Sequence, residues 1–324
     1  MDERLTISAP AFRRWAYASL AALAAIVFTG AAVRLTGSGL GCPDWPKCFG
    51  QAVAPLETHA VIEYGNRLLS GLVVVVTVVT GVLAWRRRPF RRELAVLGTL
   101  LPIGVMMQAG LGALTVIFHL KPGFVMGHYI LSMLLLDAAF ATAWVATFER
   151  EDRPASSDKL GVWAVRALLP LGSLTIIAGT AATAAGPHAG GAGTGDEIAR
   201  LEFMGASTLE WIVQRHGALA VALGLAVIGV LALLRRAGGE RRAVRPLLVV
   251  LALIATQGVV GITQWLAELP PGIVWIHVVL AVGTWVALLN SAASAGWLEP
   301  EAARIHEHHA DRGRSDLATG AAAT

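Results

Sequence analysis

Eight long apolar segments alternate with short polar segments along the chain. They cover approximately residues 15–34, 61–85, 94–116, 124–147, 162–185, 211–234, 246–266 and 273–297. A helix needs about 20 apolar residues to cross roughly 30 Å of hydrocarbon, so each segment is long enough to span a membrane. The first is too long for a removed signal peptide and lacks a small-residue cleavage site, which favours a retained span. The pattern predicts an all-α membrane protein with eight transmembrane helices.

Composition and charge agree with this fold class and orient it. Of the 324 residues, 55% are hydrophobic and only 15% are charged, which is too apolar for a soluble protein of this size. Arginines gather before the first span and in alternate connections: Arg13, Arg14, Arg86, Arg87, Arg88, Arg91, Arg92, Arg235, Arg236, Arg241, Arg242 and Arg245. By the positive-inside rule, both termini are predicted to be cytoplasmic. The net charge of +4 then follows from topology, and the expected surroundings are a lipid bilayer with no nucleic acid.

The two halves of the chain repeat each other. The stretch "QAGLGALTVIFHLKPGFVMGH" begins at Gln108 and matches "QGVVGITQWLAELPPGIVWIH", which begins at Gln257, 149 residues later. The same offset places Gly30 over Gly179. Fixed-period similarity indicates a repeated structural unit. We therefore expect tandem four-helix bundles at 15–148 and 162–297, a cytoplasmic N-terminal segment at 1–14, a cytoplasmic linker at 149–161 and a polar cytoplasmic tail at 298–324.

Polar residues open the second span, in "EYGNRLLSG". Glu63, Asn66 and Arg67 stand where hydrocarbon begins, and such residues are costly in lipid and indicate a functional site. With one extra residue in the second half, this stretch overlies "VQRHGALAV", so Asn66 matches His216. The two halves thus differ at one repeated polar position.

Three histidines stand at a common depth. His128, His216 and His277 each lie about five residues into a span that enters from outside, and helices rise about 1.5 Å per residue. His216 and His277 belong to one bundle, where facing side chains build cofactor sites. Two imidazoles in an apolar cage suit a six-coordinate haem, whereas zinc requires more ligands. The alternative is a pair of packed, hydrogen-bonded histidines.

The first half has the unequal arrangement. His128 faces Asn66 where the second half has a second histidine, so a macrocycle there has one firm axial ligand and one weak or open face. Glu63 lies one turn before Asn66, on the same helix face, and is a candidate acid, base or charge-stabilising group. His59, four residues earlier, is either a second ligand on this face or a solvated loop histidine. One half is expected to be reactive and the other structural or electron-transferring.

Several other polar residues allow two interpretations. Arg67 and Arg215 either bind haem propionates or snorkel to the interface. His188 in "GPHAGG" either covers a haem edge or is a plain loop residue. Asp137 lies inside a span without a clear partner. The remaining histidines are interpreted as surface or tail residues: His119, His306, His308 and His309.

The two cysteines lie in the first external loop, in "GCPDWPKCFG". Cys42 and Cys48 are the only cysteines of the chain, and the loop faces an oxidising compartment, where a disulfide is permitted. A zinc site would need more soft ligands than two cysteines supply.

"RLTGSGLGCPDWPKC", "IEYGNRLLSG", "GPHAGG" and the paired histidines resemble signatures of the haem A synthase family across about residues 14–297. The resemblance implies a bacterial plasma-membrane enzyme that oxidises a ring methyl of haem O to the formyl group of haem A. It implies that Glu63 is the functional glutamate, that His128 ligates or faces the substrate haem, and that His216 and His277 hold the iron of a haem b. It also implies a disulfide between Cys42 and Cys48. Asn66 departs from the family, in which histidine is common at this position.

The expected partners are haem O, a haem O synthase that supplies it, and an electron donor. No dinucleotide-binding fingerprint or P-loop occurs in the sequence, so a quinol or a redox protein is expected as the donor. Two other classes remain open: a b-type cytochrome that transfers electrons without modifying haem, and a transporter built from a parallel repeat. Haem O synthase itself is disfavoured, because the aspartate-rich motifs of prenyltransferases are missing.

Overall fold

The computed structural model describes residues 6–191, 193–195, 197–238 and 241–298. Within them, eight helical segments are long and apolar enough to cross a membrane, which confirms the predicted all-α membrane fold. The predicted tail, with its three histidines, lies outside the described residues except for Leu298.

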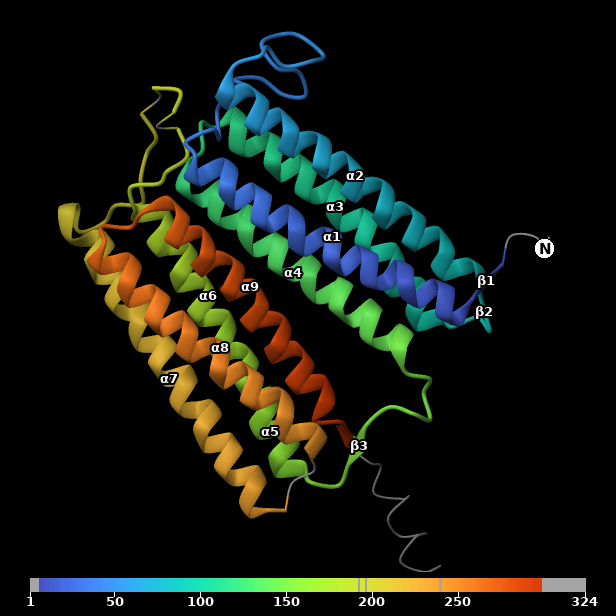
Figure 1. Ribbon diagram of the computed structural model, residues 1–324. Helices are drawn as coiled ribbons and strands as arrows, with labels where there is room; N and C mark the ends of the chain where they lie inside the picture. The colour runs from blue at the N-terminus through green and yellow to red at the C-terminus, as the bar shows by residue number, and fades with distance from the viewer. Residues whose placement is uncertain (1–5, 192, 196, 239–240, 299–324) are drawn as a thin grey trace, which may run out of the picture.

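The first four spans lie side by side in one bundle (Figure 1). They are α1 (Ala9–Leu35), α2 (Thr58–Arg86), α3 (Arg92–Ile117) and α4 (Pro122–Thr147). The ring is closed, because α1 packs against both α2 and α4, and α3 packs against the same two helices. Small residues permit close approach inside it: Gly81 and Gly98 bring the backbones of α2 and α3 together.

The second bundle contains α5 (Lys159–Arg166), α6 (Leu168–Ala185), α7 (Thr208–Arg236), α8 (Arg241–Leu266) and α9 (Pro271–Ser294), with a 3-10 turn, η2 (Gly205–Ser207), before α7. The predicted span 162–185 corresponds to one of the eight candidate spans, Lys159–Ala185, and its helix is interrupted at a single residue, Ala167, between α5 and α6. Pro170 explains the break, since its ring excludes the carbonyl of the residue four positions earlier, which is Arg166, the last residue of α5. The sequence pattern alone treated this span as continuous.

The second bundle is packed as two helix pairs. The pairs α6–α7 and α8–α9 are each in extensive contact, whereas α6 touches α9 along much less of its length than α1 touches α4. The turns that join α3 to α4 and α8 to α9 share one backbone conformation. His119 and Leu120 have φ of 51° and 54°, and Glu268 and Leu269, 149 residues later, both have φ of 61°. This match supports the repeat.

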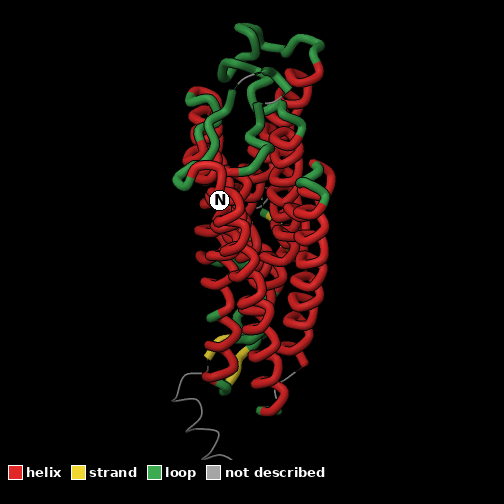
Figure 2. The backbone as a smooth tube through the Cα atoms, turned by 90° about the vertical axis from the view of Figure 1, so that its left-hand side faces the viewer, coloured by secondary structure: helices red, strands yellow, loops and turns green. Residues whose placement is uncertain are grey.

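The long connections gather at one end of the molecule, and short strands mark the other (Figure 2). We call these the loop end, which contains residues 36–57, 186–191, 193–195 and 197–207, and the strand end. The strands pair in parallel, β1 (Ile7–Ser8) with β2 (Arg87–Arg88) and β3 (Ala155–Ser156) with β4 (Trp297–Leu298). The fully buried Arg87 forms an ion pair with Glu149 there.

Polar contacts join the two bundles along their length. At the loop end, Arg34 donates to the carbonyls of His188 and Thr183 at 2.8 and 2.9 Å. Deeper in, the Trp285 indole donates to Asp137 at 2.6 Å, which supplies the partner that the sequence left open for this carboxylate. The two bundles also share one apolar core, in which Leu136 on α4 is fully buried and Val282 on α9 is nearly so. The bundles therefore form one body.

Candidate functional site

His216 and His277 come together in the second bundle, one from each helix pair. Their ring centres are 6.2 Å apart and the ring planes make an angle of 72°. Nitrogen–metal distances are about 2.0 Å, and an imidazole centre lies about 1 Å beyond its nitrogen, so rings on opposite sides of one metal have centres about 6 Å apart. The spacing therefore fits two axial ligands of one iron. Among the described residues, no group of three or more His, Cys, Asp or Glu is placed to hold a metal ion.

The hydrogen bonding of His216 leaves one ring nitrogen for a metal. Its Nδ1 lies 3.0 Å from the Thr175 carbonyl of α6, and because a carbonyl only accepts, Nδ1 is the donor. The neutral ring then has its lone pair at Nε2, the arrangement that metal-bound histidines commonly show. Gly179, on the same helix as Thr175, lies against the ring: a Cβ there would be 3.0 Å from His216 Cε1. Glycine thus provides the space for this imidazole.

His277 also lies against a glycine, in the helix pair α8–α9. We call this contact between a histidine ring and a glycine of the paired helix a cradle. A Cβ at Gly261 of α8 would lie 3.4 Å from His277 Cε1. The His277 Nδ1 and the Gln257 Oε1 are both buried without a hydrogen bond. Buried polar atoms usually have a partner, so these two atoms indicate a site that is completed by further groups. The chemistry of this donor set fits a bis-histidine haem.

The first bundle repeats half of this arrangement. His128 of α4 lies against Gly112 of α3, where a Cβ would be 3.2 Å from its Cε1. Gln108 donates to the His128 carbonyl at 2.7 Å, and the His128 Nδ1 and Gln108 Oε1 are again buried without hydrogen bonds. The cradle of the α3–α4 pair thus matches that of the α8–α9 pair.

The other half of the arrangement differs. Asn66 of α2 accepts a hydrogen bond from Thr29 of α1 at 2.7 Å, so its amide oxygen is held by the neighbouring helix. A Cβ at Gly30 would meet nothing within 4 Å, whereas the matched Gly179 lies against an imidazole. The sequence identified the difference between Asn66 and His216. The structure adds that no side chain packs against Gly30 as His216 packs against Gly179.

Glu63 and Arg67 face the first loop. Glu63 is only 6% exposed, and its carboxylate accepts from the Cys42 N–H at 2.7 Å and from Arg67 at 2.5 Å. Arg67 also donates to the carbonyls of Cys42, Asp44 and Lys47. The sequence left open whether Arg67 binds propionates or snorkels to the interface, and it predicted that Glu63 shares a helix face with Asn66. It missed the pairing of these two residues, although the i, i+4 spacing of Glu63 and Arg67 on a helix was a signal for it.

The disulfide between Cys42 and Cys48 is present, as the resemblance implied, and both residues are fully buried. The cysteines close a loop whose backbone faces Glu63 and Arg67. Asp44 braces the same loop by accepting from the N–H groups of Phe49 and Gly50 at 2.7 and 2.8 Å.

The remaining candidates lie around the loop end. His59 is in the first turn of α2, and its Nδ1 lies 2.8 Å from the Ser38 hydroxyl. His188 donates from Nε2 to the Leu269 carbonyl at 2.7 Å. Arg215 stacks over the Trp211 ring at 4.3 Å. His59 and His188 thus connect loops to helices, and Arg215 remains beside its own helix.

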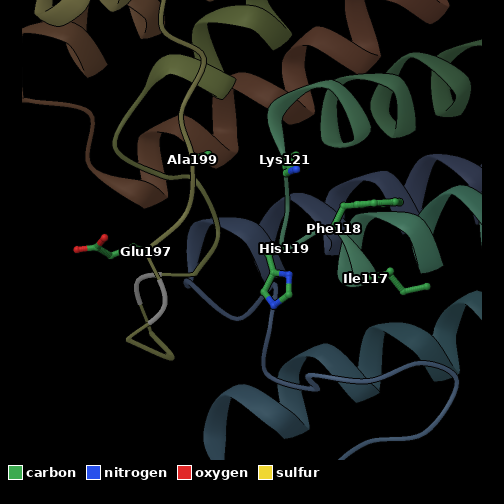
Figure 3. Close-up of a pocket in the computed structure, with 6 residues that line it drawn as sticks. All are labelled: Ile117, Phe118, His119, Lys121, Glu197 and Ala199. Carbon is green, nitrogen blue, oxygen red and sulfur yellow. The ribbon is translucent and has the colours of Figure 1, made fainter.

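A small cavity of about 290 Å³ lies apart from these histidines. Figure 3 shows its lining: Ile117, Phe118, His119, Lys121, Glu197 and Ala199. It is formed by the turn between α3 and α4 and by the connection between α6 and α7. His119 is exposed there, in agreement with its interpretation as a surface residue.

The fold and the histidine pair define a multi-pass membrane protein of two four-span bundles with a donor set suited to haem. A family profile described as cytochrome oxidase assembly protein (COX15-CtaA) matches residues 13–61 and 56–289. The chain therefore belongs to this family.

Curated relatives match a shorter part. The chain is 34% identical over 128 residues to a protein named heme A synthase from Alkalihalophilus pseudofirmus, a match that covers 38% of this chain and 42% of that protein. It is 32% identical over 133 residues to the heme A synthase of Halalkalibacterium halodurans, covering 40% and 44%. With the heme A synthase of Bacillus pumilus it shares 36% identity over 95 residues, covering 29% and 31%. The matches thus span less than half the length of these relatives.

Proposed function

We propose that the protein is a haem A synthase, which oxidises a ring methyl of haem O to a formyl group. The observation that carries the proposal is the inequality of the bundles. The second has an imidazole pair with ring centres 6.2 Å apart, and the first has His128 opposite an asparagine held by Thr29. The family match and the names of the relatives support the same activity.

In the second bundle, His216 and His277 would hold a haem b through their Nε2 atoms. Thr175 fixes the tautomer of His216, and the glycines at 179 and 261 leave room for the two rings. When bound, a bis-histidine haem supplies one-electron transfer. The two-pair packing of this bundle fits a flat group between the pairs.

In the first bundle, haem O would bind between α2 and α4 with His128 on one face and Asn66 on the other. A first hydroxylation of the methyl gives an alcohol, and a second gives a hydrate that loses water to leave the aldehyde. With dioxygen as the oxidant, each hydroxylation places one oxygen atom in the C–H bond, and the second oxygen atom leaves as water. The electron donor supplies two electrons for each hydroxylation, and two protons are taken up. Glu63 is the candidate that accepts a proton at its carboxylate or stabilises positive charge near the reacting carbon.

We also propose that the loop end faces outside and that both termini lie in the cytoplasm of a bacterium, because the arginine distribution predicts this orientation. Haem O then enters from the bilayer, supplied by a haem O synthase. A quinol or a redox protein exchanges electrons with the protein at the membrane.

Co-expression with a source of haem O tests the proposal. Extracted haems are separated and identified by mass spectrometry for the wild type, Glu63→Gln and Glu57→Gln. Glu57→Gln is the control, because it removes an exposed carboxylate six residues earlier on the chain. We expect haem A from the wild type and from Glu57→Gln, and a large loss in Glu63→Gln. A red protein that leaves haem O unchanged would assign the chain as a b-type cytochrome, and a protein without haem would favour a transporter.

A further inference from the structure

The Glu63 carboxylate belongs to a hydrogen-bonded cluster that contains Arg67 and the backbone of the disulfide loop. One oxygen accepts the Cys42 N–H at 2.7 Å, and the other accepts Arg67 Nη2 at 2.5 Å and Nε at 3.2 Å. Hydrogen bonds to charged groups are among the strongest in proteins. The side chain of Glu63 is therefore held in one orientation, with both oxygens engaged.

Arg67 connects this carboxylate to the disulfide loop. Its Nη1 donates to the carbonyls of Asp44 and Lys47, each at 2.9 Å, and its Nη2 donates to the Cys42 carbonyl at 3.2 Å. All three guanidinium nitrogens are thus engaged, and the side chain is mostly buried, with 17% exposed. The planar fork of an arginine suits such multiple acceptors, and a lysine ammonium cannot reproduce it.

The backbone of the loop is pressed against the start of α2. A Cβ at Gly41 would lie 2.1 Å from the His59 carbonyl oxygen, so only glycine fits beside Cys42. On the far side of the loop, the Tyr64 hydroxyl donates to the Ala52 carbonyl at 2.9 Å. The loop thus contacts α2 independently of the Arg67 cluster, and its closure by the disulfide fixes the groups that Glu63 and Arg67 use.

We infer that Arg67 is a positioning residue that fixes Glu63 against the disulfide loop, so that the Cys42–Cys48 bond affects turnover through the placement of this carboxylate. The inference rests on the proposed function for its effect on turnover. In this inference the guanidinium of Arg67 binds Glu63 and backbone carbonyls of the loop, and it does not bind a haem propionate. The disulfide then serves to hold the loop in the conformation that positions Glu63. Residues that act through one another have non-additive effects, which makes the inference testable.

The first experiment is a double-mutant cycle on haem-loaded protein. Glu63→Gln, Arg67→Gln and the double variant are compared for turnover and for haem O affinity. We expect Arg67→Gln to lower turnover at least about tenfold, Arg67→Lys to recover part of it, and the double variant to match Glu63→Gln. Haem O affinity should be nearly equal in Glu63→Gln and the double variant. A tenfold weaker affinity in the double variant would show that Arg67 binds the substrate, which overturns the inference.

The second experiment does not depend on turnover. The rate at which dithiothreitol reduces the disulfide is measured by alkylation of the released thiols. Both cysteines are fully buried, so we expect Arg67→Gln to speed reduction about tenfold by freeing the loop. Lys47→Gln is the matched control, because it removes an exposed cation from the same loop and leaves the backbone carbonyl; its rate should equal that of the wild type. Equal rates in Arg67→Gln and the wild type would overturn the inference.

The outcomes separate the two proposals. A wild type that makes no haem A contradicts the proposed function, while the reduction rates still decide whether Arg67 holds the loop. A wild type that makes haem A, with additive losses in the cycle, contradicts the positioning role alone. The haem absorption spectrum verifies folding in each variant, and Arg67→Lys replaces Arg67→Gln if the latter fails to accumulate.

Discussion

The two bundles have the same order of four spans and differ in the side chains that face their interiors. In the second, both helix pairs contribute an imidazole beside a glycine, His216 with Gly179 and His277 with Gly261. In the first, only His128 has this arrangement, and the position matched to His216 is an asparagine bonded to Thr29. The first bundle is a closed ring, whereas the second is two loosely joined pairs. If the proposed function holds, the two bundles have separate tasks that depend on a few side chains and one pairing of helices.

The largest expected effect follows from removing a ligand. His216→Ala or His277→Ala should abolish the low-spin haem that we propose for the second bundle, because one imidazole cannot replace two axial ligands. Asn66→Ala should largely keep it. The measurement is the visible spectrum and the ratio of haem to protein, with His119→Ala, an exposed histidine at the loop end, as the control. Equal losses in His216→Ala and Asn66→Ala would remove the distinction between the bundles.

A smaller effect is expected at the matched glycines. In Gly179→Ala the new Cβ would lie 3.0 Å from His216 Cε1, while in Gly30→Ala it would meet nothing within 4 Å. We therefore expect Gly179→Ala to lower haem content or shift the low-spin bands, because the ring must move. Gly30→Ala should leave the spectrum unchanged. If both substitutions change the spectrum alike, the two cradles are equivalent and the comparison fails.

The disulfide loop gives the first bundle a feature of its own. Gly41→Ala places a Cβ 2.1 Å from the His59 carbonyl oxygen, so the loop must shift away from α2 and weaken the bond from Cys42 N–H to Glu63. We expect turnover to fall several-fold while the haem of the second bundle is retained. Gly65→Ala is the control on α2, because its Cβ would meet nothing within 4 Å. Unchanged turnover in Gly41→Ala would argue against a role for the loop.

The smallest effect concerns the junction of the bundles. The Trp275 indole donates to the Phe28 carbonyl at 2.9 Å, and Trp275→Phe removes this bond while keeping most of the ring. A typical hydrogen bond contributes about 1 kcal/mol, so thermal unfolding in detergent should shift by only a few degrees. Spectrum and turnover should be unchanged. Loss of haem in Trp275→Phe would mean that the junction controls the site.

The sequence predicted the parts of this structure that depend on residue type and period. Apolar length gave the eight spans, and the offset of 149 matched two turns that share positive φ at His119 and Glu268. The break before Leu168 was missed, because a proline is often tolerated inside a helix, as Pro102 is in α3. Whether Pro170 interrupts its helix depends on local packing that periodicity does not report.

The proximity of His216 and His277 was predicted correctly, their role as haem ligands stays a prediction, and the other contacts of the site were predicted less well. The histidine pair follows from depth and repeat, since side chains at matched positions share surroundings. The direction of Glu63 did not follow, because it depends on the fold of the loop that brings Cys42 N–H to the carboxylate. Likewise, the Trp285 partner of Asp137 lies in the other bundle, and no local pattern links residues so far apart in the chain.

Haem stoichiometry tests the central claim most directly. Protein purified from cells that make haem b but no haem O is analysed for haem per chain and for low-spin, bis-histidine character by electron paramagnetic resonance. Unequal bundles predict one low-spin haem per chain, lost on His277→Ala and kept on Asn66→Ala. Two equivalent low-spin haems per chain, or none, would contradict the account.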